Sequence, residues 1–118
     1  MWHRTMGSIV LAAPRSPSSD LRLFAHCLPA KRGGVGILAI NIGTSPRLIT
    51  PGGRGLAWVM TGQPLEMHSA LINGKEPSLD SHQNLVGLGG KKFAGALAVP
   101  GQAIVFVAMP RAGNPACR

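Results

Sequence analysis

The acidic side chains are the first candidates for catalysis, and the 118-residue chain has only four: Asp20, Glu66, Glu76 and Asp80. Two carboxylic acids held close together could work as general acid and general base. Glu76 and Asp80 have the spacing of one helix face, but Pro77 and the neighbouring turn argue against a helix. We therefore expect solvated loop and edge charges, and the sequence assigns no catalytic residue.

Cys27 follows His26 directly, which could suggest a nucleophile beside its base. Adjacent residues of a strand point to opposite faces, so this arrangement is not favoured. The histidines show no metal-ligand spacing, and Cys27 and Cys117 are too far apart for a zinc signature, so we expect no metal and no cofactor. The two cysteines form one disulfide if the chain reaches an oxidising compartment, or remain free thiols in the cytosol.

Twelve basic residues against four acidic ones give a net charge of +8, which favours attraction to a polyanion. Only Lys31-Arg32 and Lys91-Lys92 form pairs, and these four are the candidate polyanion-binding residues. The other cations are spread along the chain, as on an ordinary arginine-rich surface, which is the favoured interpretation. The sequence supplies no stacking aromatic residues in basic surroundings, so a nucleic-acid partner is not expected. Gly52-Gly53-Arg54-Gly55 lacks the Lys-Ser/Thr of a phosphate loop and is interpreted as a turn.

The residues that could do chemistry must be positioned by strands. Leu21, Leu23, Ala25 and Cys27 alternate with polar or aromatic residues, the pattern of a strand with one buried face. The run 35–42 is almost wholly apolar, as expected of a strand covered on both faces. Further strands are predicted at 56–61, with Trp58 in the core, and at 93–99 paired with 103–109. Asn73-Gly74 predicts a type I′ turn joining arms 69–72 and 75–79 in a hairpin.

The length fits one domain, and sixteen Gly and ten Pro leave no long helical period. Several short strands with turn signals between them predict an antiparallel β-sandwich. Loops are expected at 14–19, 29–34, 43–47, 51–55 and 85–92. No apolar stretch is long enough to span a membrane.

The order of several segments resembles the C-terminal β-domain of heparanase-like proteins, family 79 of the glycoside hydrolases, and its plant-type members above all. Residues 2–11 are similar to the passage from the last barrel helix through a Met-Gly step into a Val-Leu strand. Residues 71–75 resemble a Leu-Asn-Gly-Lys hairpin. The remaining matching segments are 21–27, 36–42, 104–107 and the terminal Pro115-Ala116-Cys117.

The resemblance implies how the chain is divided and what it does. Residues 1–7 would be a remnant of the preceding barrel helix, and 8–118 a C-terminal β-sandwich whose edge lacks a strand that the family takes from its N-terminal portion. It also implies a disulfide between Cys27 and Cys117. The parent activity would be hydrolysis of β-linked glucuronic acid in proteoglycan or plant polysaccharide. The two catalytic glutamates lie in the family's barrel, so the chain alone is expected to be inactive and its partner would be that barrel.

Two further expectations concern context. Residues 3–13 could be taken for a short export signal, but the resemblance explains them as an interior segment, with Met1 an internal start or truncation point. For the family, the location would be secreted, cell wall, or lysosomal or vacuolar. The alternative function is a free-standing basic β-sandwich module that binds acidic polysaccharide.

Overall fold

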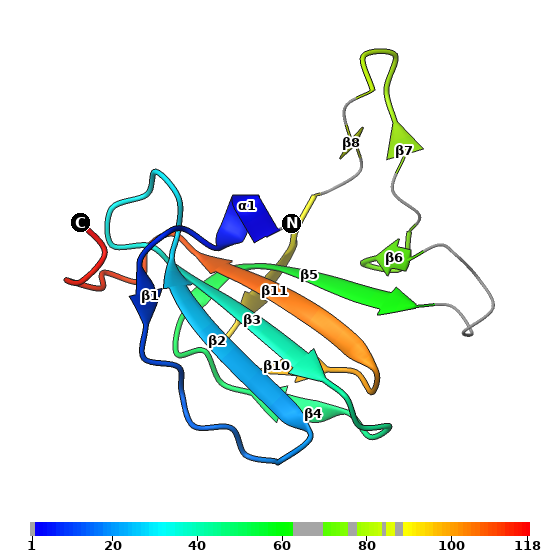
Figure 1. Cartoon of the computed structure of the whole chain (residues 1–118), viewed down its shortest axis with the longest axis horizontal. Coiled ribbons are helices and arrows are strands. Elements are labelled where there is room, and N and C mark those ends of the chain that lie inside the picture. Colours follow the sequence, from blue (N-terminus) through cyan, green and yellow to red (C-terminus); the bar gives the residue numbers. More distant parts are fainter. Residues whose placement is uncertain (1, 63–69, 76–77, 84, 87–88) are drawn as a thin grey trace.

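The chain folds into antiparallel strands with one short helix at its N-terminal end (Figure 1). The structure, a computed structural model, describes residues 2–62, 70–75, 78–83, 85–86 and 89–118. The elements in chain order are α1 (Trp2–Thr5), β1 (Val10–Leu11), β2 (Leu21–Cys27), β3 (Val35–Asn41), β4 (Arg47–Ile49), β5 (Arg54–Gly62), β6 (Ala70–Ile72), β7 (Ser78–Leu79), β8 (Leu85–Val86), β9 (Lys91–Ala94), β10 (Leu97–Val99) and β11 (Ala103–Met109). The sheets formed by these residues do not close into a barrel, and the predicted all-β class is confirmed.

One main sheet carries most of the strands, in the order β1-β2-β3-β11-β5, with β6 and β9 both paired to the outer edge of β5. The strands β3 and β11 lie at its centre, and both are buried along nearly their whole length. Apolar side chains on both faces of these strands are therefore removed from water, which explains the almost continuous apolar run predicted for residues 35–42.

The two faces of the main sheet are covered by different elements. One face, called the ribbon face below, is packed against a two-stranded ribbon formed by β4 and β10. Ile49 and Val99 of this ribbon join Leu21, Ala39 and Val105 in one apolar cluster. The helix face carries a second cluster beneath α1 and the residues that follow it: Met6, Leu28, Leu38, Trp58, Ile72, Phe106 and Ala108. Trp58 is 6% exposed, so its predicted core position is confirmed.

The turn predicted at Asn73-Gly74 is present, with positive φ at both residues, 51° and 79°. The Asn73 side chain also forms hydrogen bonds with backbone groups of β5, as a residue of a neighbouring strand would. Its Oδ1 accepts a hydrogen bond from the Val59 backbone N–H at 2.8 Å, and its Nδ2 donates to the Ala57 oxygen at 3.1 Å and the Gly89 oxygen at 3.3 Å. Asn73 thus continues the backbone ladder of β5 between the positions paired by β9 and β6.

Replacing Asn73 by glycine is expected to lower the free energy of unfolding by about 2–3 kcal/mol, because two hydrogen bonds to the edge of β5 and one to Gly89 are lost. Glycine keeps the positive φ, so the loss reports on the side chain alone. Asn73→Ala should lose about 1 kcal/mol more, since alanine is strained at positive φ. Urea unfolding followed by circular dichroism measures both variants, and equal stability of Asn73→Gly and the unchanged protein would contradict the assignment.

The predicted pairing of the second hairpin arm, residues 75–79, is wrong. Lys75 forms only an isolated bridge with Ile72, whereas Ser78–Leu79 pair with Leu85–Val86 to form the separate β7–β8 hairpin. This also places strand residues in the segment 85–92, which was predicted as a loop. Of the predicted hairpin, residues 69, 76 and 77 lie outside the described residues.

The predicted strand at 93–99 is divided in two, and its pairing with 103–109 is wrong. Gly95 has a φ of 77° and separates β9, which stays on β5 of the main sheet, from β10, which pairs with β4. The strand β11 instead lies between β3 and β5. The left-handed glycine turns the chain out of the main sheet, so that one apolar run contributes to both layers. The ribbon strand β4 likewise begins within the predicted loop 43–47.

Candidate functional site

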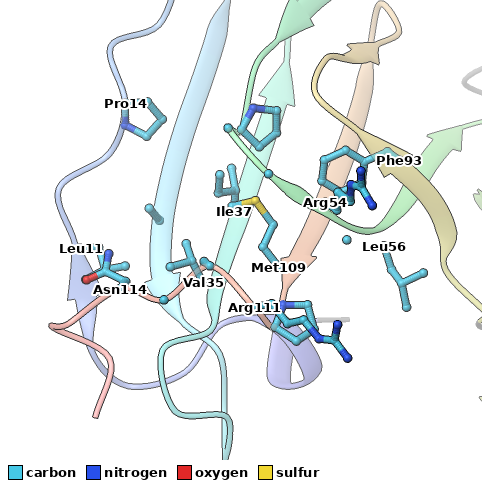
Figure 2. A pocket seen from close by; sticks show the side chains of 18 of the residues that line it. Leu11, Pro14, Val35, Ile37, Arg54, Leu56, Phe93, Met109, Arg111 and Asn114 are labelled. Carbon is cyan, nitrogen blue, oxygen red and sulfur yellow. The ribbon is translucent and has the colours of Figure 1, made fainter.

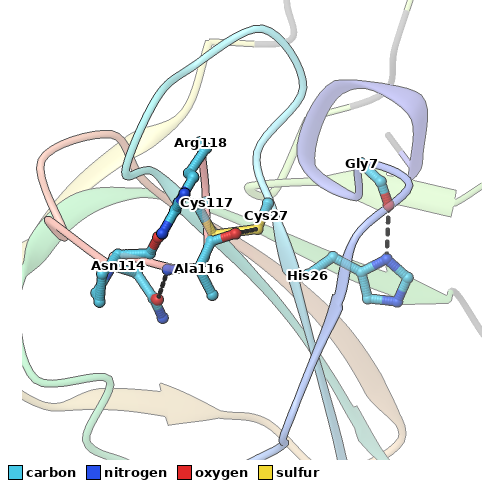
Figure 3. Close-up of a disulfide and its surroundings, with 8 residues drawn as sticks. Gly7, His26, Cys27, Asn114, Ala116, Cys117 and Arg118 are labelled. Atoms are coloured by element: carbon cyan, nitrogen blue, oxygen red, sulfur yellow. Dashed lines mark hydrogen bonds between the residues drawn. A yellow bond between two sulfur atoms is a disulfide. The ribbon is translucent and has the colours of Figure 1, made fainter.

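The disulfide marks one end of the main sheet. Cys27, the last residue of β2, is bonded to Cys117 in the C-terminal tail, with 5.3 Å between their Cα atoms and a sequence separation of 90. The Gly33 N–H donates to the Cys117 oxygen, and the Asn114 N–H donates to the Gly33 oxygen. The tail is therefore held against the turn between β2 and β3 (Figure 3). This end of the molecule is called the disulfide end below.

His26 lies beside the disulfide but has a structural role. Its Nδ1 is 2.7 Å from the Gly7 backbone oxygen (Figure 3). Its ring meets the Trp2 ring edge-on at a centroid distance of 5.3 Å. The ring thus connects α1 and the residues after it to β2. Because Cys27 is bonded to Cys117, the adjacent His26 and Cys27 do not form a nucleophile and base pair.

The two basic pairs lie at the same end of the sheet. Lys31 and Arg32 are in the turn between β2 and β3, and Lys91 and Lys92 begin β9. The register runs from Lys92 through Leu56 and Ala108 to Gly36 in β3, which is three strand spacings or roughly 14 Å. All four side chains are exposed. Whether they bind a polyanion stays a prediction.

Three further cations lie at this end that the sequence does not indicate as polyanion-binding residues: Arg54, Arg111 and Arg118. None has a basic neighbour in sequence, and the motif that contains Arg54, Gly52-Gly53-Arg54-Gly55, is interpreted as a turn. Arg54 begins β5, Arg111 follows β11, and Arg118 follows Cys117. Antiparallel pairing brings the start of β5 beside the end of β11, and this long-range arrangement is what gathers them.

A groove opens on the ribbon face at the disulfide end, beyond the part covered by β4 and β10, and it encloses about 1470 Å³. Its floor is formed by Val35, Ile37 and Met109 (Figure 2). Leu11 and Pro14 lie along one side, Phe93 and Arg54 along the other, and Arg111 and Asn114 come from the tail. None of the described residues that line the groove is acidic.

Asp20, the carboxylate just before β2, lies at the opposite end of the sheet and is bound by two side chains. It accepts a hydrogen bond from the Ser18 hydroxyl, and its Oδ2 is 3.1 Å from Nη2 of Arg47. Both contacts stabilise the charged form, and they hold the pKa of Asp20 below its ordinary value of 3.8. A carboxylate kept ionised in this way is a poor proton donor near neutral pH.

The engaged carboxylate predicts a pH dependence of stability. Because the pKa of Asp20 is lowered by folding, its contribution is complete above the unfolded value of 3.8 and is lost as the pH falls through the folded value. The thermal midpoint should therefore fall more steeply below about pH 4 in the unchanged protein than in Asp20→Asn. Thermal unfolding from pH 2 to pH 6 measures this, and parallel curves would contradict the assignment.

The other candidate groups do not assemble into a site in the described part of the chain. Glu66, His68 and Glu76 lie outside the described residues, and Asp80 follows β7. Among the described residues no three His, Cys, Asp or Glu side chains gather where they could hold a metal. None of the described helices is long and apolar enough to cross a membrane.

Comparison with known proteins gives a relative in sequence and several similar structures, of which two are described below. No family model matches the chain. Heparanase-like protein 1 of Arabidopsis thaliana is 32% identical over 77 residues, which cover 65% of this chain and 14% of that protein. This homology bears out the resemblance to heparanase-like proteins, and it is partial. The chain is thus much shorter than the relative that it matches.

The two structures are both larger than this chain. A GH30 endoxylanase from Clostridium papyrosolvens C71 has a TM-score of 0.45 and 17% identity, and the match covers 89% of this chain and 23% of the endoxylanase. CelM2, a bifunctional glucanase-xylanase from a metagenome library, has a TM-score of 0.44 and 16% identity, with 80% of this chain and 17% of CelM2 covered.

Proposed function

We propose that this chain is the non-catalytic C-terminal β-domain of a heparanase-like glycoside hydrolase of family 79. The observation that carries the proposal is the 32% identity with heparanase-like protein 1, since it agrees with the resemblance of the strand order. The parent reaction would be hydrolysis of β-linked glucuronic acid in proteoglycan or plant polysaccharide. The β-domain would support the architecture of the barrel that carries out this reaction.

The described carboxylates support an accessory role. A retaining glycosidase needs a proton donor and a nucleophile about 5–5.5 Å apart. Asp20 is held ionised by Ser18 and Arg47 at one end of the main sheet, and Asp80 lies in the separate β7–β8 hairpin. The acid and the nucleophile would then come from the barrel.

The proposed barrel contact is α1 together with the neighbouring helix face, which fits a division after residue 7. On this face Phe24 and Ile104 are 45% and 37% exposed, beside the partly buried Ile40 and Met60. Large apolar side chains exposed together on one face are typical of a surface that meets a partner. The disulfide is consistent with an oxidising compartment, so we propose a secreted, cell-wall, or lysosomal or vacuolar location.

The test is the native transcript upstream of Met1, combined with an activity assay. We expect an uninterrupted reading frame that encodes a barrel with two catalytic glutamates. The isolated chain should not hydrolyse 4-nitrophenyl β-glucuronide, whereas the complete product should. An in-frame stop directly upstream of Met1, or hydrolysis by the isolated chain, would contradict the proposal.

A second candidate function is a free-standing basic module that binds acidic polysaccharide. The observation in its favour is that the two predicted basic pairs lie at one end of the sheet, with Arg54, Arg111 and Arg118 near them. Retention on a heparin column that survives moderate salt, and that falls when Lys31-Arg32 or Lys91-Lys92 is neutralised, would support it.

A further inference from the structure

We propose that the groove at the disulfide end binds an oligosaccharide that carries uronate groups, with Arg54 and Arg111 as the residues that bind its carboxylates. The choice of a sugar over another anion rests on the proposed function; the choice of an anion rests on the charges of the groove. The groove has the form of a ligand site: a concave apolar surface with a few polar groups at defined places.

The charges of the groove favour an anion. Arg54 and Arg111 line it, both are exposed, and among the described residues neither has a carboxylate partner. A guanidinium group presents two parallel N–H donors that match the two oxygens of a carboxylate. Because the lining that the structure describes contains no acidic residue, no described side chain within the groove offsets the charge of these cations. Lys92 also lines the groove. Lys31, Arg32 and Lys91 extend the positive potential around this end and would attract a longer anionic chain.

The apolar part of the groove favours sugar rings over nucleotides. Pro14 and the half-buried Phe93 present surfaces against which the C–H faces of a sugar can pack, whereas the floor residue Met109 is buried (Figure 2). Among the described residues that line the groove Phe93 is the only aromatic one, and it packs partly against the core cluster. Single strands of nucleic acid are held by several aromatic side chains on which successive bases stack. The groove does not offer that arrangement.

The experiment is isothermal titration of the disulfide-bonded chain with hexagalacturonate, a chain of six uronates. The test variant Arg54→Gln/Arg111→Gln removes two charges from the groove. The matched control Arg22→Gln/Lys75→Gln removes two charges from residues that do not line it. We expect the test variant to bind about tenfold more weakly or worse, and the control to change by less than about fivefold. Equal losses would show that only net charge matters, and would overturn the proposal.

Two further ligands show whether binding depends on the sugar rings, on the negative charges or on both. A neutral glucose hexamer should bind far more weakly than hexagalacturonate, and a polyphosphate of six charges should bind more weakly too, because it lacks the C–H faces. Phe93→Leu keeps an apolar side chain in the core but removes the flat ring, so it should weaken hexagalacturonate and leave polyphosphate unchanged. Tighter binding of polyphosphate or of a DNA hexamer, or no binding of hexagalacturonate at millimolar concentration, would overturn the proposal.

The outcome is independent of the test of the proposed function. An in-frame stop upstream of Met1 with intact, arginine-dependent binding would contradict the accessory role and leave the groove as a sugar site. A continuous reading frame that encodes a barrel, together with no binding of hexagalacturonate, would support the accessory role and contradict the sugar site. Thermal unfolding of each variant without ligand is the control for folding. A midpoint equal to that of the unchanged protein shows that the loss of affinity does not come from a loss of fold.

Discussion

Loss of the Cys27–Cys117 disulfide is expected to lower the free energy of unfolding by about 4–5 kcal/mol. In the chain-entropy model the effect grows with the length of the closed loop, and here the two cysteines are 90 residues apart. Single domains are stable by only about 5–15 kcal/mol in total, so the reduced chain should be close to unfolding at room temperature. Urea unfolding with and without a reducing agent measures the difference.

The double variant Cys27→Ala/Cys117→Ala separates the disulfide from other effects of the reducing agent. It should match the reduced protein in stability, and the reducing agent should not change it further. Without the disulfide the tail would be held to the β2–β3 turn mainly by the hydrogen bonds at Gly33, and these add about 1 kcal/mol each. A loss below about 2 kcal/mol would show that the denatured chain retains structure and that the loop model overstates the effect.

The parts of the fold that the sequence predicts correctly depend on local patterns. The alternation in Leu21–Cys27, the continuous apolar run of β3 and the positive φ of Asn73 and Gly74 are each encoded by neighbouring residues. Burial of one face or both faces of a strand leaves a periodic trace within a few positions. These features are therefore visible without any knowledge of the partner strands.

Strand partners are not encoded locally, and the errors of prediction occur there. The strand β11 was expected beside residues 93–99, its neighbours in sequence, but it lies between β3 and β5. Nothing within Ala103–Met109 distinguishes these partners, because the choice depends on the packing of the whole sheet. Gly95, which separates β9 from β10, is one of sixteen glycines, and no neighbouring residue distinguishes it as the point where the strand is divided.

The candidate groove depends on the same long-range pairing. The sequence indicated Lys31, Arg32, Lys91 and Lys92 only because they are adjacent in pairs. Arg54 and Arg111 line the groove because β5 begins where β11 ends, so a pattern along the chain cannot reveal them. The disulfide came from the resemblance to heparanase-like proteins, since the spacing of two cysteines alone leaves free thiols as an alternative.

Asn41→Asp is expected to destabilise the protein by about 3–5 kcal/mol at neutral pH. Asn41 is 2% exposed, and its Nδ2 donates to the Ser45 oxygen at 2.9 Å, the Pro100 oxygen at 3.1 Å and the Val99 oxygen at 3.2 Å. Its Oδ1 accepts from the Gly43 N–H at 3.0 Å. These bonds join the end of β3 to the end of β10, and therefore connect the main sheet with the ribbon. A carboxylate of the same shape would place negative charge against three carbonyl oxygens.

The pH dependence of this variant identifies the cause of its instability. Burial against carbonyl oxygens raises the pKa of the new carboxyl, and the protonated form can donate one hydrogen bond again. Stability relative to the unchanged protein should therefore recover in part as the pH falls from 7 to 5, a range above that in which Asp20 loses its charge. Asn41→Ala, which adds no charge, should be destabilised by a similar amount at both pH values. A pH-independent loss in Asn41→Asp would mean that Asn41 fills space rather than fastening the two layers through its amide.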